Sequence, residues 1–418
     1  MELQPSQKTF RSYLAFFLGQ QVSLLGSSAA QFVIIWWITL ETKSALYLSI
    51  ASFVGFAPMI ILTPFAGVLV DRWNRKAIIG SVDFLQALTT VILIFLFWSG
   101  NVSIWYILIF LAMRSTYQAF NVPAVNAVVP AMVPQDKLSR VNGLNYLLNG
   151  IMMLTGPVVA ATLLIFARIE QILWIDPVTF IVAVIPLLLI KIPDVREKQD
   201  KAPFRKEFAE GLAFIKNARG LLPLVMMATV LNFLIVPLDV LLPYFVKFDH
   251  LGGAESLALI FACLQGGTLA GGLLMSVTKG FKRKMVAATA FIYLIFLGYA
   301  LVSFTPTGLF WFMALGALVL GFGVAPANVS FMTIIQTIVP LKMQGRVNSV
   351  MMALASAATP FGMILSGAIV GFTGTVMLFS SCVVTGVLTL TISWFFTDMR
   401  HVEKIEAKPS PENQVNAV

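Results

Sequence analysis

Four ionisable residues interrupt long apolar stretches of the 418-residue chain: Asp83, Arg114, Asp176 and Asp239. Removing a charge from water is costly, and on membrane-insertion scales one at the bilayer centre costs about 2.5–3.5 kcal/mol. Such residues therefore face a polar interior, pair with one another, or bind a ligand or a proton. We treat all four as candidates for substrate binding or proton coupling.

Each candidate also has a purely structural interpretation. Arg114 lies about half-way along its apolar stretch and could form an ion pair with Asp83 or Asp176. Asp176 could be a helix-packing acid. Asp83 lies near one end of its stretch, where we favour a partnership with basic loop residues. Asp239 could bind protons, bind a cationic substrate, or be a shallow surface acid.

The first apolar stretch adds uncharged polar side chains. Gln20, Ser23, Ser27 and Gln31 recur at helical spacing, so one helix face could line a cavity. We include Gln20 and Gln31 among the candidate site residues.

Several chemistries have no sequence support. The chain has no phosphate-binding Gly-x-x-x-x-Gly-Lys-Ser/Thr loop, which argues against direct use of ATP. Its two histidines, His250 and His401, belong to no metal-binding motif, and Cys263 and Cys382 both lie in apolar stretches. We expect no metal, no cofactor and no enzymatic activity.

The elements that carry these residues are predicted to be membrane-spanning helices. Hydrophobic residues make up 58% of the chain and charged residues 11%, whereas soluble chains carry about a quarter charged residues. The apolar stretches are continuous and of helix length, about 20 residues. The sequence predicts an all-α membrane protein with twelve spans, near residues 13–40, 45–70, 77–99, 103–128, 141–167, 171–190, 221–246, 255–278, 285–304, 308–333, 345–371 and 374–396.

Basic residues alternate in step with these spans. If both termini are cytoplasmic, 24 of the 28 lysines and arginines fall in cytoplasmic segments, as expected for a multi-pass protein of the cell membrane. The net charge of +9 then reflects topology and anionic lipid headgroups rather than nucleic acid binding.

The two halves of the chain repeat each other. Arg140-Val141-Asn142 returns as Arg346-Val347-Asn348, 206 residues later, and each follows a Val-Pro pair by six residues. An even separation of six spans predicts two parallel six-helix repeats with a substrate site between them. We expect six-helix bundles at 1–190 and 221–396, a cytoplasmic linker with an amphipathic helix at 191–220, and a cytoplasmic tail at 397–418.

The connection after the second span carries a more specific pattern, Gly67-x-x-x-Asp71-Arg72-x-x-Arg75-Lys76. It resembles the signature loop of the major facilitator superfamily, which implies gating between conformations by these residues. Asn74 replaces the usual glycine there, a mild departure because a left-handed turn tolerates Asn. Gly67 would let helices approach closely.

Further segments resemble the macrolide-efflux branch of that superfamily, including Trp36-Trp37, Thr42-Lys43-Ser44-Ala45 and Arg114-Ser115. Gly156-Pro157 resembles the antiporter motif of the fifth span, which implies a helix kink. The resemblance implies a secondary transporter that exports amphiphilic, macrolide-like molecules in exchange for protons. A siderophore or lipid exporter, or a membrane scaffold or sensor, is the alternative. We expect a monomer whose partners are a small molecule, protons and lipids.

Overall fold

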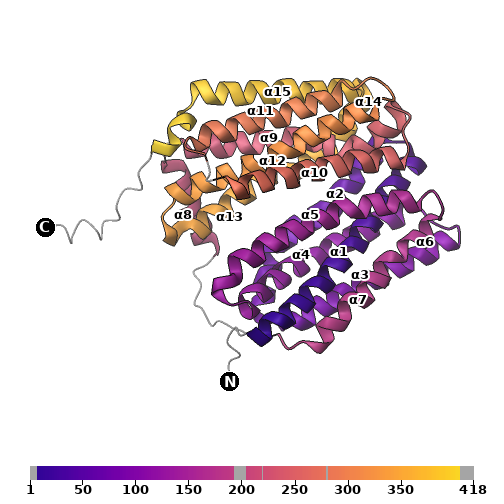
Figure 1. Ribbon diagram of the computed structural model, residues 1–418. Helices are drawn as coiled ribbons and strands as arrows, with labels where there is room; N and C mark the ends of the chain where they lie inside the picture. Colours follow the sequence, from indigo (N-terminus) through magenta and orange to yellow (C-terminus); the bar gives the residue numbers. More distant parts are fainter. Residues whose placement is uncertain (1–6, 193–203, 219, 279–280, 405–418) are drawn as a thin grey trace.

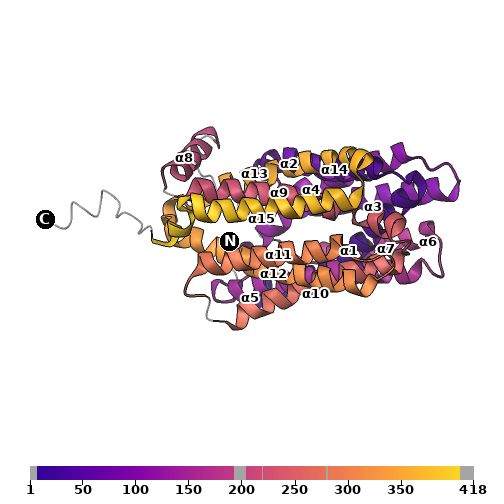
Figure 2. The same ribbon diagram turned by 90° about the horizontal axis from the view of Figure 1, so that it is seen from above.

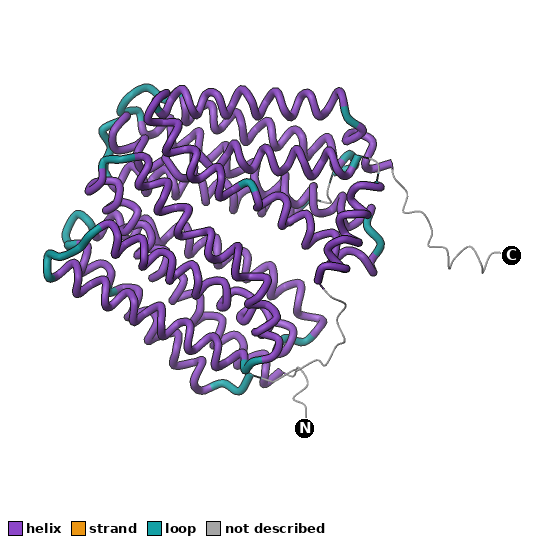
Figure 3. The backbone as a smooth tube through the Cα atoms, turned by 180° about the vertical axis from the view of Figure 1, so that it is seen from behind, coloured by secondary structure: helices purple, strands orange, loops and turns teal. Residues whose placement is uncertain are grey.

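The computed structural model describes residues 7–192, 204–218, 220–278 and 281–404, and these residues form helices joined by turns and short loops (Figure 3). This confirms the predicted all-α class.

The described residues of the first half form seven α-helices. They are α1 (Gln7–Thr42), α2 (Ala45–Arg72), α3 (Arg75–Trp98), α4 (Ile104–Met132), α5 (Leu138–Leu163), α6 (Ile169–Leu173) and α7 (Ile175–Leu189), with a 3-10 turn at Gln135–Lys137. The short α6 and the following α7 together make one span, Ile169–Leu189.

The second half begins with an amphipathic helix. The helices are α8 (Phe204–Asn217), α9 (Leu221–Tyr244), α10 (Ala254–Val277), α11 (Lys284–Ser303), α12 (Phe310–Ile338), α13 (Leu341–Ala357), α14 (Thr359–Thr373) and α15 (Thr375–Phe396). A π-helical turn, Phe245–Asp249, extends α9, and a 3-10 helix, Asp398–Lys404, follows α15. The structure describes only part of the predicted linker and tail. Beyond residue 192 it describes residues 204–218 and 220 of the linker, and it describes residues 397–404 of the tail.

Eleven segments of the described chain are long and apolar enough to span a membrane. Helix α4, which corresponds to the predicted span at 103–128, is not among these eleven. Its 29 residues include Arg114, Gln118 and Asn121, which lower its apolar character. Helix α4 still packs along α2 and α3 within the membrane-spanning part. The protein is therefore a multi-pass helical membrane protein in which one span is unusually polar.

The helices fall into two groups (Figure 1). Helix α1 packs against α5 and α7, and α2 against α4, whereas α12 packs against α10 and α11, and α9 against α14 and α15. Between the groups, α2 packs against α14 and α5 against α10. Figure 2 shows α8 at the side of the second group, where it packs against α13.

The two groups converge at one end of the molecule and diverge toward the end near the termini, which we call the terminal side (Figures 1 and 3). Near the converging end the hydroxyl oxygens of Ser49 and Ser366 lie 3.1 Å apart. A Cβ added at Gly367 would collide with the Ser49 Oγ, so this glycine permits the close approach of α14 to α2. The contact between α2 and α14 is therefore close near the converging end, and α5 and α10 form a second contact between the groups.

Candidate substrate cavity and buried polar network

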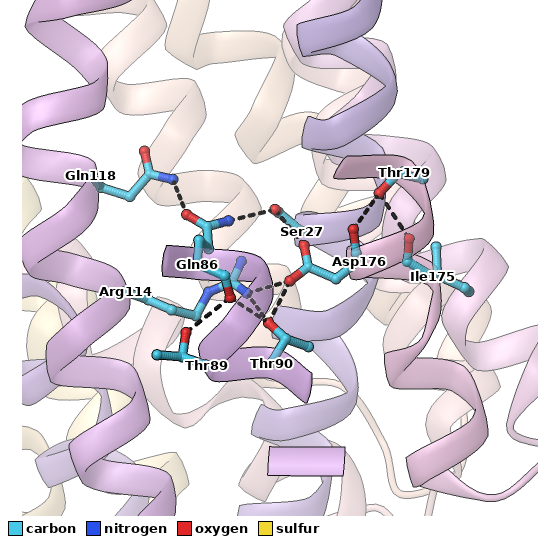
Figure 4. Close-up of polar contacts among 9 residues, drawn as sticks. All are labelled: Ser27, Gln86, Thr89, Thr90, Arg114, Gln118, Ile175, Asp176 and Thr179. Atoms are coloured by element: carbon cyan, nitrogen blue, oxygen red, sulfur yellow. Dashed lines mark hydrogen bonds and ion pairs between the residues drawn. The ribbon is translucent and has the colours of Figure 1, made fainter. Parts of the chain in front are cut away.

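A buried ion pair joins α4 to α7. The Arg114 guanidinium donates to the Asp176 carboxylate at 2.9 Å, and the two residues are 7% and 3% exposed (Figure 4). Of the interpretations that the sequence left open for Arg114, the structure places it in an ion pair with Asp176 rather than with Asp83. The Arg114 guanidinium also lies over the Phe110 ring, 5.4 Å from its centroid.

Two hydroxyl groups complete the surroundings of Asp176. Ser27 donates to Oδ1 at 2.7 Å and Thr90 donates to Oδ2 at 2.6 Å, so helices α1 and α3 join the network (Figure 4). A buried ion pair is tolerated when its remaining lone pairs are hydrogen-bonded. Both oxygens of the Asp176 carboxylate are hydrogen-bonded, so the condition is met. The network thereby links four helices of the first half: α1, α3, α4 and α7.

The network continues through two glutamines that the sequence analysis did not single out. The Gln86 side-chain amide donates to Ser27 Oγ at 2.9 Å, and the Gln118 side-chain amide donates to the side-chain oxygen Oε1 of Gln86 at 3.3 Å. The available signal was spacing: Gln118 lies one helical turn after Arg114, and Gln86 one turn before Thr90.

Asp83 lies in a separate polar cluster. It accepts hydrogen bonds from the Gln20 amide at 3.0 Å and the Asn121 amide at 2.5 Å. The favoured expectation of a basic partner is wrong in this conformation, because both of these partners are carboxamides. An uncharged partner leaves the carboxylate charge uncompensated, unlike that of Asp176.

A cavity of about 640 Å³ lies between the two helix groups. The first half contributes Arg114, Gln118 and Gln31 to its wall, and α9 contributes Asp239. A second cavity of about 490 Å³ shares Asp239 and Gln265 with the first. The candidate residues predicted from the sequence therefore fall into separate places. Arg114, Gln31 and Asp239 lie on the cavity wall, and Asp176 lies behind Arg114. Gln20 and Asp83 form the separate polar cluster.

Asp83 and Asp176 both have polar partners. Asp239, in contrast, has no ionic or hydrogen-bond partner within the described part of the chain. Its side chain is exposed to the cavity, and the other second-half residues of the cavity wall are apolar, such as Phe261 and Leu264, apart from Gln265. An unpaired carboxylate on a largely apolar wall can bind either a proton or a cation.

The predicted gating loop is anchored to neighbouring helices. Arg75 donates to the carbonyl oxygen of Ala127 at 3.1 Å, and Lys76 donates to those of Leu188 and Ile190 at 2.8 and 2.7 Å. Lysine commonly satisfies the last carbonyls of a helix in this way. The side chains of Asp71 and Arg72 lie outside the described part of the structure.

Two details of that loop differ from expectation. Asn74 has φ −67°, not a left-handed conformation, and its side-chain oxygen accepts from the Ala77 N–H at 3.0 Å, so it caps α3. Gly67 makes no close helix contact here, because an added Cβ would meet no atom within 4 Å.

The Gly156-Pro157 pair lies within α5. A Cβ at Gly156 would lie 2.5 Å from Ser28 Oγ, so the glycine permits close packing of α5 on α1. Pro157 contributes to the wall of the larger cavity. The kink itself stays a prediction.

Two helix groups that enclose a cavity within a membrane-spanning chain define a secondary transporter. The family model of the Major Facilitator Superfamily matches residues 16–315 and 276–416. The chain belongs to this superfamily, whose members are transporters rather than enzymes.

Several relatives are named as efflux proteins. Macrolide efflux protein A of Streptococcus pyogenes is 30% identical over 85% of this chain and 88% of its own length. The protein of the same name from Enterococcus faecalis is 28% identical over 77% of this chain and 99% of its length. Multidrug efflux pump Tap of Mycobacterium bovis is 24% identical over 79% of this chain and 80% of its length.

Solved structures share the fold. The nucleoside transporter NupG has a TM-score of 0.67 at 13% identity, covering 92% of this chain and 98% of that one. A bacterial homologue of the iron transporter ferroportin, described as inward-facing, has a TM-score of 0.68 at 15% identity, covering 92% and 98%.

Proposed function

We propose that the protein exports amphiphilic, macrolide-like small molecules in exchange for protons, by alternating access to the cavity between its two halves. The observation that carries this proposal is Asp239, an unpaired acid on the part of the cavity wall that the second half forms, where the other lining residues are apolar apart from Gln265. The relatives named as macrolide and multidrug efflux proteins support the substrate class.

Exchange needs a group that holds either the proton or the substrate, but not both. The Asp239 carboxylate meets this need if it releases its proton when a cationic amphiphile binds. On the other side of the membrane it binds a proton again when the amphiphile leaves. Asp176 is less suited to the role because Arg114, Ser27 and Thr90 already occupy its oxygens. Arg114 is then a fixed positive charge on the opposite wall.

Direction and topology belong to the same proposal. We place the terminal side in the cytoplasm, because the basic residues gather in the segments on that side. The described conformation then opens inward, as the ferroportin homologue is described to do. The bundles at 1–190 and 221–396 would rock against each other about their contact at α2 and α14.

The test measures accumulation of a tritium-labelled macrolide in cells that express the wild type, Asp239→Asn or Asp136→Asn. Asp136 is a matched control because it lies exposed in the turn before α5. We expect the wild type and the control to lower accumulation until an uncoupler is added, and Asp239→Asn to lose most of this uncoupler-sensitive export.

Two outcomes would contradict the proposal separately. Equal accumulation in empty and expressing cells would refute macrolide export. Export that persists at full rate in the presence of the uncoupler would refute proton coupling, and the siderophore and lipid alternatives would then be tested in the same cells with those labelled compounds.

A further inference from the structure

A third cavity, of about 430 Å³, lies within the second half between α9, α11, α12 and α13. Three asparagines from three helices line it: Asn232 of α9, Asn328 of α12 and Asn348 of α13. The rest of its lining is apolar, with four methionines and no charged residue among the residues that form it. We call this cavity the asparagine recess.

The three carboxamides have no hydrogen-bond partner anywhere in the described chain. Three carboxamides of the first half behave differently, since Gln20, Gln86 and Asn121 all donate to other side chains. Asn232 and Asn328 are exposed in the recess and Asn348 is half-buried, so these amides can bond to water until a ligand replaces it. The recess therefore has hydrogen-bonding capacity that the fold itself does not use.

The recess is continuous with the cavity that contains Asp239. The 490 Å³ cavity is lined by both Asn232 and Asp239, and it shares Ile235 and Val324 with the recess. Asn232 and Asp239 are seven residues apart on α9, which places them on one helix face about 10 Å apart along the axis. The recess lies on the terminal side of Asp239, because α13 begins there (Figure 1).

We propose that the asparagine recess is a second substrate subsite, which binds the uncharged, oxygen-bearing part of an amphiphile while its cationic group lies at Asp239. This inference rests on the proposed export function and narrows its substrate class. The substrates would carry hydroxyl, ester or ether oxygens about 10 Å from a basic amine.

The chemistry of the wall supports this division. Carboxamides both donate and accept, so they suit hydroxyl and carbonyl oxygens. The Met332 and Met352 thioethers are flexible and fit irregular hydrocarbon surfaces. A second charge would be desolvated there without a counter-charge, so the recess selects against dications.

The test uses purified protein in lipid nanodiscs and tritiated erythromycin, a macrolide with one basic amine. The variants are Asn328→Leu, Asn348→Leu and Ala228→Trp, the last of which fills the recess. Ala290→Trp is the control, because Ala290 is exposed on α11 and is not among the residues that line the recess. Dissociation constants and melting temperatures are measured for each.

We expect each Asn→Leu change to raise Kd about threefold to tenfold, and Ala228→Trp to raise it further, whereas the control stays within about twofold of the wild type. The Asn→Leu variants should melt at the same or a higher temperature, since they remove an unpaired amide. A structural asparagine would instead lower the melting temperature when replaced.

Unchanged Kd values in all three variants, or lowered melting temperatures in both leucine variants, would overturn the recess proposal and leave the export proposal standing. Failure of the wild type to bind erythromycin would count against the proposed function, and the recess would lose its substrate class with it.

Discussion

Ser49 of α2 and Ser366 of α14 lie with their hydroxyl oxygens 3.1 Å apart, and this contact joins the two halves of the protein near their converging end. The neighbouring Gly367 brings the backbones together, since an added Cβ would lie 2.7 Å from the Ala45 carbonyl oxygen. The described conformation therefore depends on a residue without a side chain at this position.

Replacing Gly367 should shift the conformational equilibrium. Gly367→Val forces α14 away from α2, and overpacking of this kind costs about 1–3 kcal/mol. We expect spin labels at positions 143 and 345, both in open space on the terminal side, to move closer together as this conformation loses population. Double electron–electron resonance measures the change.

The matched control is Gly371→Val on the same helix, where an added Cβ would meet nothing within 4 Å. It should leave the label distances unchanged. Equal distance distributions for Gly367→Val and the wild type would show that the contact does not control opening.

Removing one partner of the Arg114–Asp176 ion pair should lower stability more than replacing both partners. Arg114→Gln leaves the Asp176 carboxylate buried without its counter-ion, which costs about 3–5 kcal/mol. The double variant Arg114→Gln with Asp176→Asn replaces the ion pair with a neutral hydrogen bond and should recover more than half of that loss. Thermal unfolding of the purified variants in detergent compares them.

A double variant as unstable as Arg114→Gln would refute this account of the network. If the double variant regains stability but not export, the positive charge of Arg114 on the cavity wall has a role in transport as well.

Arg346 should hold α8 against α13. Its guanidinium pairs with Glu210 and lies 3.6 Å from a Glu207 carboxylate oxygen. These side chains are more than a third exposed, so the pairs contribute about 1 kcal/mol or less. We expect Arg346→Gln to speed amide hydrogen exchange in α8 about twofold to fivefold.

The internal repeat supplies the control. Arg140 occupies the corresponding position at the start of α5, where it is exposed and makes no ion pair within the described part of the chain. Arg140→Gln should leave exchange in α8 unchanged, and equal effects of the two substitutions would refute the specific contact.

His250 should make stability pH-dependent. It lies in the loop between α9 and α10, 4% exposed, with its ring against Phe245 at 4.4 Å between centroids. Burial lowers the pKa of His250 below its usual 6.5, although Asp249 and a backbone hydrogen bond at Pro306 partly oppose this. The unfolded chain therefore binds the proton more readily, and stability falls as the pH drops below about 6.5.

We expect the melting temperature to fall between pH 7.5 and 5.5, and His250→Phe to remove part of that fall while keeping the aromatic contacts. Melting curves at both pH values measure the difference. The same pH dependence in wild type and variant would exclude His250 as its source.

The sequence predicted where the helices lie along the chain better than it predicted which helices and side chains contact one another. The predicted span at 345–371 corresponds to α13 and α14, which run from Leu341 to Thr373, because length and apolar content define a span. Which side chains meet depends on the rotation of each helix about its axis. Spanning helices such as α11 and α15 are apolar on nearly all sides, so no amphipathic stripe fixes that rotation.

The polar network illustrates that limit. The sequence indicated that Arg114 needs a partner but could not choose between Asp83 and Asp176, which lie on different helices. Gln86 and Gln118 were missed because isolated glutamines in apolar stretches have no motif. Asp239 was found because an ionisable residue within an apolar stretch is conspicuous in the sequence.

The polar character of α4 has a consequence for how the chain is made. Arg114 leaves the ribosome 62 residues before its partner Asp176. At about 5–20 residues per second, this separation corresponds to roughly 3–12 seconds of synthesis. Helix α3 is synthesised before α4, and its Thr90 accepts a hydrogen bond from the Arg114 guanidinium at 3.5 Å in the folded protein. The counter-ion of Arg114 therefore becomes available only after the chain has been synthesised as far as α7.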